Sequence, residues 1–262
     1  MKAIRKRLRR WLGGAWLRKS QRLRFATVNG VRCKRVVLPD TSSAIRIERS
    51  LEAFGPSPRF PQLVARFENE VWVVFVPGER LVRADMPGAL DEIIALYSDL
   101  YTRAPKAVAA SETLSLQRAQ QDLRFLRQVG VLDEAAWREL TAATERLVPE
   151  RLWLGFDYVD PVVKNFVRPA DGGPICAIDV ESLAQEAPLG TGVAKAAVHW
   201  LTLEQRKRLL AAIEPKVPGL SAQLPFVELC FLARWTKMKL LTGKSDYLDA
   251  ARFTPFRLQG SA

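Results

Sequence analysis

The hydrophobic pattern of the chain changes at Pro77-Gly78, and this change limits the possible folds more than any other feature of the sequence. Before it, residues 25–38 and 63–76 each have the pattern of a strand, a turn and a second strand. Between these hairpins a helix is predicted, from an N-cap residue at 40–42 to Phe54. The first part of the chain should therefore be a small antiparallel sheet with one helix.

After Pro77-Gly78 the pattern is mainly helical. Apolar residues recur at helical spacing over five segments: about 87–103, 114–129, 133–147, 192–214 and 224–242. A short strand pair, 165–168 and 175–179, interrupts them. At 262 residues the chain is long enough for two lobes around a cleft. The predicted fold class is α+β, with a small sheet and one helix followed by a larger helical part that carries one inserted hairpin.

The positive charge of the chain is concentrated at its N-terminus. The net charge is +12, but residues 1–25 hold ten Lys or Arg residues and no acidic residue, which leaves only +2 for the other 237 residues. Nucleic-acid binding by the body would call for basic and aromatic residues interleaved there. Nucleic acid is therefore not expected as a partner.

Residues 1–24 form a basic arm with apolar residues at helical spacing: Ile4, Leu8, Trp11, Leu12 and Ala15. Such an amphipathic helix can lie on an anionic membrane, where each Lys or Arg contributes roughly 1 kcal/mol. An extension that stays in solvent or packs on the body is the alternative. Because no stretch reaches the ~18 uncharged residues of a membrane span, the expected membrane contact is peripheral.

Cysteine and histidine usage excludes several kinds of site. Cys33, Cys176 and Cys230 stand far apart, so neither a disulfide framework nor a zinc knuckle is indicated, and a reducing, cytoplasmic location fits. The single histidine, His199, lies in an apolar stretch and is interpreted as structural. Histidine-rich metal sites are excluded, so carboxylates and lysines must carry any catalysis.

One segment has the parts that phosphoryl transfer needs. Asp160 is followed five positions later by Asn165, and after the 165–179 hairpin by Asp179. One carboxylate can accept the proton of the attacking hydroxyl, while an amide and a second carboxylate offer oxygen ligands to Mg²⁺. Asp157 is the main competitor for the base, but eight positions separate it from Asn165.

These motifs resemble those of the aminoglycoside phosphotransferase and choline kinase group, and of bacterial lipopolysaccharide core sugar kinases. Asp160 with Asn165 is similar to their catalytic loop, and Ile178-Asp179 with Glu181 to their metal motif. The segment 75–81 resembles the hinge between their lobes. The resemblance implies that Asp160 is the catalytic base and that Asn165 and Asp179 hold Mg²⁺.

By the same resemblance Lys34 would contact the ATP phosphates, and Glu48 on the first helix would hold Lys34 in place. Arg32 and Arg35 are rivals for the phosphate-binding role. The implied fold is the protein-kinase-like, two-lobed fold. Its expected parts are an N-terminal arm (1–24), an N-lobe of sheet and helix (25–77) and a helical C-lobe (78–262).

The expected function is ATP-dependent phosphorylation of a hydroxyl on a small or lipid-linked sugar, with ATP and Mg²⁺ as cofactors. The basic arm favours an acceptor at the cytoplasmic face of a membrane, such as a lipopolysaccharide core sugar. A soluble kinase of the aminoglycoside or choline type is the alternative within this class. Tyr158 and Val159 replace the usual His-Gly, and no glycine-rich loop is present, so a regulatory binding module with the same fold is the alternative from another class.

Overall fold

A computed structural model describes residues 23–28, 30–243 and 249–257 of the chain. The described residues form two compact units. The first extends to Arg80 and includes residues 167–181, while the second contains residues 81–166 and the chain from Ser182 onward. Of the expected basic arm, residues 1–22 lie outside the described residues.

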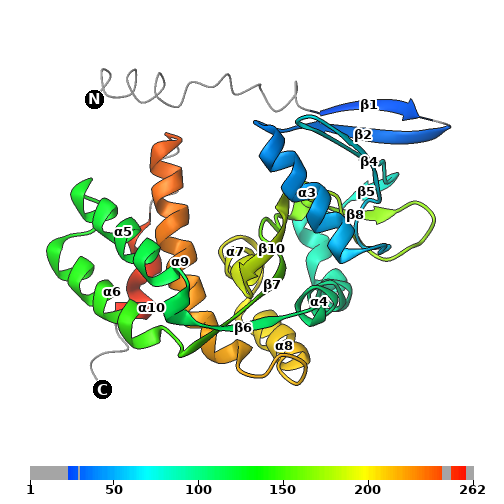
Figure 1. Ribbon diagram of the computed structural model, residues 1–262. Helices are drawn as coiled ribbons and strands as arrows, with labels where there is room; N and C mark the ends of the chain where they lie inside the picture. Colours follow the sequence, from blue (N-terminus) through cyan, green and yellow to red (C-terminus); the bar gives the residue numbers. More distant parts are fainter. Residues whose placement is uncertain (1–22, 29, 244–248, 258–262) are drawn as a thin grey trace. The chain divides into compact units, whose positions relative to one another are not determined.

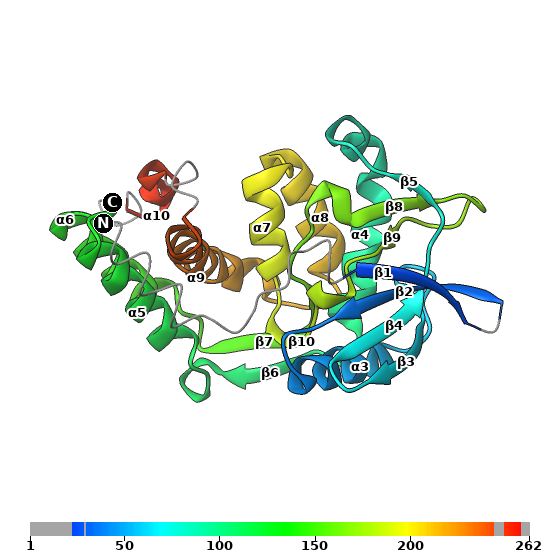
Figure 2. The same cartoon turned by 90° about the horizontal axis from the view of Figure 1, so that it is seen from above.

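The first unit contains a four-stranded antiparallel sheet in the order β1-β2-β4-β3 (Figures 1 and 2). Its strands are β1 (Leu23–Val28), β2 (Val31–Val37), β3 (Leu63–Phe67) and β4 (Glu70–Val74). β2 is an inner strand, in which Lys34 lies opposite Phe25 on one side and Val73 on the other. The two predicted hairpins are confirmed.

The helix between the hairpins, α3 (Thr41–Phe54), begins and ends where the sequence predicts. The Asp40 carboxylate accepts a hydrogen bond from the Ser43 N–H at 2.7 Å, which satisfies one of the free donors of the first turn. Its buried face, which includes Ile47, Leu51 and Phe54, covers the sheet on the side of β3 and β4 (Figure 2). Burial of this apolar face holds the helix on the sheet.

A second, three-stranded sheet in the order β5-β8-β9 completes the first unit. Its strands are β5 (Gly78–Arg80), β8 (Phe166–Pro169) and β9 (Cys176–Ala177), and a 3₁₀ turn, η4 (Val180–Ser182), follows. β5 passes so close to β8 that a Cβ on Gly78 would lie 2.1 Å from the Arg168 carbonyl oxygen. Only glycine fits there, which accounts for the glycine at position 78.

The second unit is built from seven α-helices among the described residues. They are α4 (Met86–Thr102), α5 (Ser115–Gln128), α6 (Glu134–Leu147), α7 (Thr191–His199), α8 (Leu203–Ile213), α9 (Leu220–Leu241) and α10 (Thr254–Arg257). The described part of this unit also contains the 3₁₀ turns η1 (Arg83–Asp85), η2 (Ala110–Glu112), η3 (Val163–Asn165) and η6 (Ala250–Phe253). None of the described helices is long and apolar enough to cross a membrane.

The helical unit also contains a three-stranded antiparallel sheet that the sequence did not predict, in the order β10-β7-β6. Its strands are β6 (Lys106–Ala109), β7 (Arg151–Tyr158) and β10 (Leu183–Pro188). The expectation that this part carries only one inserted hairpin was therefore wrong. β6 is short and the pairing of β10 with β7 shifts register between Ala184 and Ala187, so neither strand shows regular alternation.

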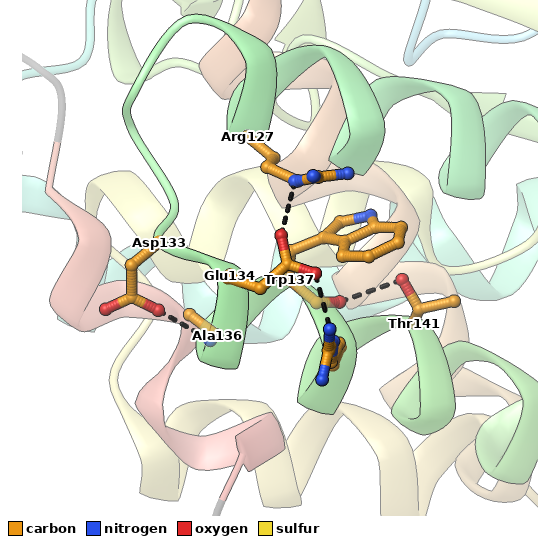
Figure 3. A network of polar contacts seen from close by, with 7 residues as sticks. Arg127, Asp133, Glu134, Ala136, Trp137 and Thr141 are labelled. Atoms are coloured by element: carbon orange, nitrogen blue, oxygen red, sulfur yellow. Dashed lines mark hydrogen bonds and ion pairs between the residues drawn. The ribbon is translucent and has the colours of Figure 1, made fainter.

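The α5–α6 pair is held at its turn by a network of polar contacts (Figure 3). Asp133 caps α6 through the Ala136 N–H at 2.7 Å. Glu134 lies 2.6 Å from the Arg127 guanidinium, which in turn lies 4.5 Å from the centre of the Trp137 ring. Beneath this turn, α5 and α6 pack with α9 and α10 around one apolar core. These contacts fix α5 beside α9.

Candidate functional site

Asp160 lies in the loop after β7, and its carboxylate is paired with a residue that the sequence did not single out. Lys195, on the second turn of α7, places its Nζ 2.6 Å from Asp160 Oδ1. The pair is partly buried, with the Lys195 side chain 20% exposed and the Asp160 side chain 35%. An ion pair shielded in this way is screened by salt less than one in open solvent.

Asn165 closes the same loop. Its amide nitrogen donates to the Asp160 carbonyl oxygen at 2.9 Å, and its own backbone N–H donates to the Val162 carbonyl oxygen. The 3₁₀ turn η3 therefore explains the spacing of five residues, because it folds Asn165 back onto Asp160. The structure brings these two predicted residues together within the helical unit.

Asp157, the other candidate for the catalytic base, is fully buried and lies at the N-terminus of α7. Its Oδ2 accepts hydrogen bonds from the Tyr101 hydroxyl at 3.2 Å and from the Gly192 N–H at 3.1 Å. Burial raises the pKa of Asp157 from 3.8 to about 7, although the N–H of Gly192 and the Tyr101 hydroxyl lower it. A carboxyl so enclosed anchors the start of α7 and is not accessible to an acceptor.

Two tyrosines of α4 hold the residues that stand before Asp160. The Tyr97 hydroxyl donates to the Tyr158 carbonyl oxygen at 3.1 Å, and the Gly190 N–H donates to the Tyr101 hydroxyl at 2.9 Å. Gly192 fits against this cluster only because it has no side chain, since a Cβ there would lie 2.2 Å from the Tyr158 carbonyl oxygen. The loop that lacks the usual His-Gly is thus fixed by contacts from α4 and α7.

In the first unit, the structure brings Lys34 beside the segment that carries Asp179. The Lys34 ammonium group donates to the Ile178 carbonyl oxygen at 2.8 Å, so it lies against the residue that directly precedes Asp179. Burial raises the pKa of the nearby Cys176 thiol to about 12, and the Lys34 charge acts in the opposite direction. The structure therefore brings two of the predicted site residues, Lys34 and Asp179, close together within the first unit.

The two rivals of Lys34 have other partners. Arg32 lies over the Phe75 ring, 4.4 Å from its centre, and Arg35 is paired with Glu70. Both contacts engage the guanidinium group, whereas the Lys34 ammonium contacts the segment that carries Asp179.

Glu48 does not hold Lys34 in the described structure. Its carboxylate lies 2.5 Å from the Arg66 guanidinium on β3. The reason is the position of Glu48 on α3, which packs against β3 and β4, while Lys34 lies on β2. The expected Lys34–Glu48 pair is therefore corrected to a Glu48–Arg66 pair.

Asn165, in the helical unit, and Asp179, in the first unit, each offer a side-chain oxygen of the kind that Mg²⁺ prefers. No cluster of three or more His, Cys, Asp or Glu residues that could hold a metal occurs among the described residues. Mg²⁺ bound to a nucleotide needs only one or two protein carboxylates, with phosphate and water oxygens as its other ligands. The hydrogen bond from the Asn165 amide nitrogen to Asp160 orients the amide, whose oxygen is the end that binds a hard cation.

Comparison of the sequence with protein-family models and with curated proteins finds no match. Comparison of the structure does find similar folds. Choline kinase LicA from Streptococcus pneumoniae has a TM-score of 0.67 at 11% identity, over 98% of this chain and 96% of that one. An aminoglycoside phosphotransferase, APH(4)-Ia, has a TM-score of 0.61 at 14% identity, over 91% and 90%. An ethanolamine kinase from Plasmodium vivax has a TM-score of 0.55 at 14% identity, over 95% and 84%.

These similarities show the fold. The chain has the protein-kinase-like fold of small-molecule phosphotransferases, with a small antiparallel sheet unit and a helical unit, as the sequence predicts. At 11–14% identity the similarity extends to the fold alone.

Proposed function

We propose that this chain, which has the protein-kinase-like fold, transfers the γ-phosphoryl group of ATP to a hydroxyl of a small or lipid-linked sugar. The observation that carries the proposal is the loop in which Asn165 donates to the Asp160 carbonyl oxygen while Lys195 pairs with the Asp160 carboxylate. This loop presents a fixed, partly exposed carboxylate, as a general base requires.

In the proposed reaction Asp160 accepts the proton of the acceptor hydroxyl. The oxygen of that hydroxyl forms a bond to the γ-phosphorus of ATP, the bond between this phosphorus and the β–γ bridging oxygen breaks, and ADP leaves. Lys195 keeps the carboxylate oriented, because its ammonium group contacts Oδ1. The role of the loop is mainly positioning, which accounts for a large share of catalysis in phosphoryl transfer.

Asn165 and Asp179 are proposed to hold Mg²⁺, and Lys34 to contact the ATP phosphates. Bound Mg²⁺ would neutralise the charge that develops on the phosphates during transfer. The hydrogen bond from Lys34 to the Ile178 carbonyl supports this assignment, because it keeps a cation next to Asp179. Glu48 is left out of the nucleotide site, since its ion pair is with Arg66.

A lipopolysaccharide core sugar at the cytoplasmic face of a membrane is the acceptor that we propose. The support comes from the sequence of residues 1–24, whose ten charges are all positive and whose apolar residues recur at helical spacing. Peripheral binding to an anionic membrane would bring the enzyme to a lipid-linked acceptor. Flotation with vesicles of neutral and anionic lipid, for the full chain and for a variant without residues 1–22, tests this part.

The test of the activity is ATP turnover with Mg²⁺ over a panel of core oligosaccharide, aminoglycoside and amino-alcohol acceptors. Wild type is compared with Asp160→Ala and Asp179→Asn, and Asp171→Asn in the exposed β8–β9 turn serves as the control. We expect acceptor-dependent turnover that falls by roughly 10²–10⁴-fold in Asp160→Ala and is retained in Asp171→Asn.

The same turnover assay, together with a thermal-shift measurement, distinguishes the kinase from the alternative, a regulatory binding module. Tyr158 and Val159 stand where a His-Gly pair is usual, which favours a regulatory binding module. Wild-type protein that neither turns over ATP nor gains thermal stability from Mg-ATP would establish that alternative and overturn the kinase proposal.

A further inference from the structure

A cavity of about 610 Å³ lies within the helical unit, between α5, the end of β10, the start of α7 and α9. Its size is in the range of pockets that bind small molecules. Three cations line it: Arg118 from α5, and Arg234 and Lys237 from successive turns of α9. The cavity lies inside one unit of the structure, so its walls are defined by that unit alone.

The carboxylate of Asp122 compensates only part of this positive charge. Asp122 is 4% exposed, and its Oδ1 lies 2.5 Å from Lys237 Nζ and 3.6 Å from the Arg234 guanidinium. It is the one acid among the described residues that line the cavity, so three cations leave an excess of two positive charges. A buried carboxylate is costly unless it is paired, so Asp122 also fixes Lys237 at the wall.

The remaining wall is largely apolar. Phe226, Val227 and Phe231 of α9 face the cavity. A cavity with apolar sides and a few charged groups both excludes water and orients a ligand, because the charges interact more strongly where water is displaced. The lining therefore suits a compact molecule that carries negative charge.

Helix α7 contributes both to the wall of the cavity and to the ion pair of Asp160. Thr191, the first residue of α7, lines the cavity. Lys195 comes four residues later, so it lies on the same face of the helix one turn further on. Because the Lys195 ammonium contacts the Asp160 carboxylate, α7 carries a residue of the cavity wall and the partner of the proposed base about one helical turn apart.

We propose that this cavity binds the acceptor, and that the acceptor carries a phosphate or carboxylate group which Arg118, Arg234 and Lys237 recognise. This inference rests on the proposed kinase function and narrows its substrate class. A cationic acceptor is disfavoured by the excess of positive charge, although the structures with a similar fold include a choline kinase, an ethanolamine kinase and an aminoglycoside phosphotransferase. The class of acceptor therefore cannot be inferred from the similarity of fold.

A purely structural role of the same residues makes a different prediction. If the cations served only to join α5 to α9 through Asp122, their removal would lower the stability of the fold and leave no ligand-specific effect. Arg118 is exposed on α5 and Arg234 is 63% exposed, so neutralising either should disturb the fold little. Substitutions at Arg118 and Arg234 therefore test ligand binding with less effect on the stability of the fold than a substitution of Lys237, which is paired with the buried Asp122.

The experiment is calorimetric titration of the full chain with glucose 6-phosphate, inorganic phosphate and glucose. Wild type is compared with Arg118→Gln and Arg234→Gln, and Arg124→Gln, an exposed arginine of α5 outside the cavity, is the matched control. Loss of one charge-assisted contact should weaken the binding of the two phosphate-containing probes about tenfold to a hundredfold. Glucose should bind more weakly than its phosphate, and Arg124→Gln should behave as wild type.

A second pair of measurements determines whether the anionic group that the cavity recognises belongs to the sugar or to the lipid-linked part of the acceptor. Phosphoryl transfer is compared for a phosphorylated core oligosaccharide free in solution and for the same oligosaccharide on its lipid anchor in vesicles. If Arg118→Gln raises KM for both, the cavity recognises the sugar's own phosphate. If it does so only for the anchored form, the cavity recognises an anion of the lipid-linked part.

Failure of this inference is distinguishable from failure of the kinase function. Mg-ATP turnover with neutral or cationic acceptors, together with unchanged phosphate binding in both arginine variants, would overturn the anionic acceptor and leave the kinase standing. Charge-dependent sugar phosphate binding without ATP turnover would establish the cavity as a ligand site and overturn the kinase.

Discussion

The Lys195 ammonium group lies 2.6 Å from the Asp160 carboxylate, and the two residues come from separate elements of the helical unit, α7 and the loop after β7. A cation in this place can do two things in the proposed reaction. It orients the carboxylate toward the acceptor, and it offers positive charge near the transferring group.

Lys195→Met should therefore lower kcat by about tenfold to a hundredfold and leave KM for ATP within about twofold. Lys195→Arg should recover part of the lost rate, because it restores a cation, whereas Lys207→Met, at an exposed position of α8, should have no effect. Steady-state kinetics with varied ATP measures both constants. A KM for ATP that rises as much as kcat falls would assign Lys195 to nucleotide binding instead.

Asp157→Asn should change how stability depends on pH. In the folded protein the pKa of Asp157 is raised to about 7, above the 3.8 expected when unfolded, so the stability linked to this group is fully present below pH ~4. It is lost as the pH rises to about 7, at up to about 1.4 kcal/mol per pH unit.

Asparagine does not titrate, so the free energy of unfolding of Asp157→Asn should increase relative to wild type between pH 4.5 and 7 and then level off. Urea denaturation at several pH values measures the difference. The matched control is Asp171→Asn, which removes a carboxylate in the exposed turn between β8 and β9. A flat difference for Asp157→Asn would mean that its carboxyl does not stay buried.

Gly192→Ala and Gly88→Ala form a matched pair at two helical glycines. A Cβ at Gly192 would lie 2.2 Å from the Tyr158 carbonyl oxygen and 2.6 Å from Asp157 Oδ1, while at Gly88 it would meet nothing within 4 Å. We expect Gly192→Ala to lose about 3 kcal/mol or more of unfolding free energy. Gly88→Ala should gain about 0.5–1 kcal/mol through helix propensity. Equal thermal shifts for the two would contradict the close packing at α7.

Lys34→Met and Glu48→Gln should have different effects on the affinity of the protein for Mg-ATP. Removal of the Lys34 charge should weaken binding about tenfold or more, because a charge-assisted contact to phosphate is lost. Glu48→Gln should change the affinity by less than about twofold, since the partner of Glu48 is Arg66. Fluorescence titration with a nucleotide analogue measures both. Equal weakening would mean that Glu48 reaches Lys34 in the nucleotide-bound protein.

Local patterns in the sequence predict much of this fold because their causes are local. Asp40 and Asp133 each cap the helix that follows, through a backbone N–H three residues on, and both caps can be read from the chain. The Asn165–Asp160 contact is equally local, because a single 3₁₀ turn produces it. Periodicity then defines α3, α4, α5 and α6 to within a residue or two of their observed ends.

The features that the sequence does not predict all depend on distant contacts. Lys195 is an unremarkable lysine in an apolar helix until α7 places it against Asp160. The partner of Glu48 depends on which strand α3 covers, and the β6–β7–β10 sheet depends on pairings across many residues. The same holds for Asp157. Its hydrogen bond from the Gly192 N–H, a contact between distant parts of the chain, shows it to be a buried anchor of α7 and not a catalytic base. No periodicity encodes such pairings.

The first unit is discontinuous in the chain, since β5 pairs with β8 and β8 lies beside β9, both far downstream. During synthesis the ribosome must therefore release the chain as far as Glu181 before this unit can be completed. Until then the edge of β5 that pairs with β8 is exposed, which is a point where a nascent chain can associate with another. A fragment ending at Arg80 would have the same exposed edge, so the two units cannot be separated by a single cut of the gene.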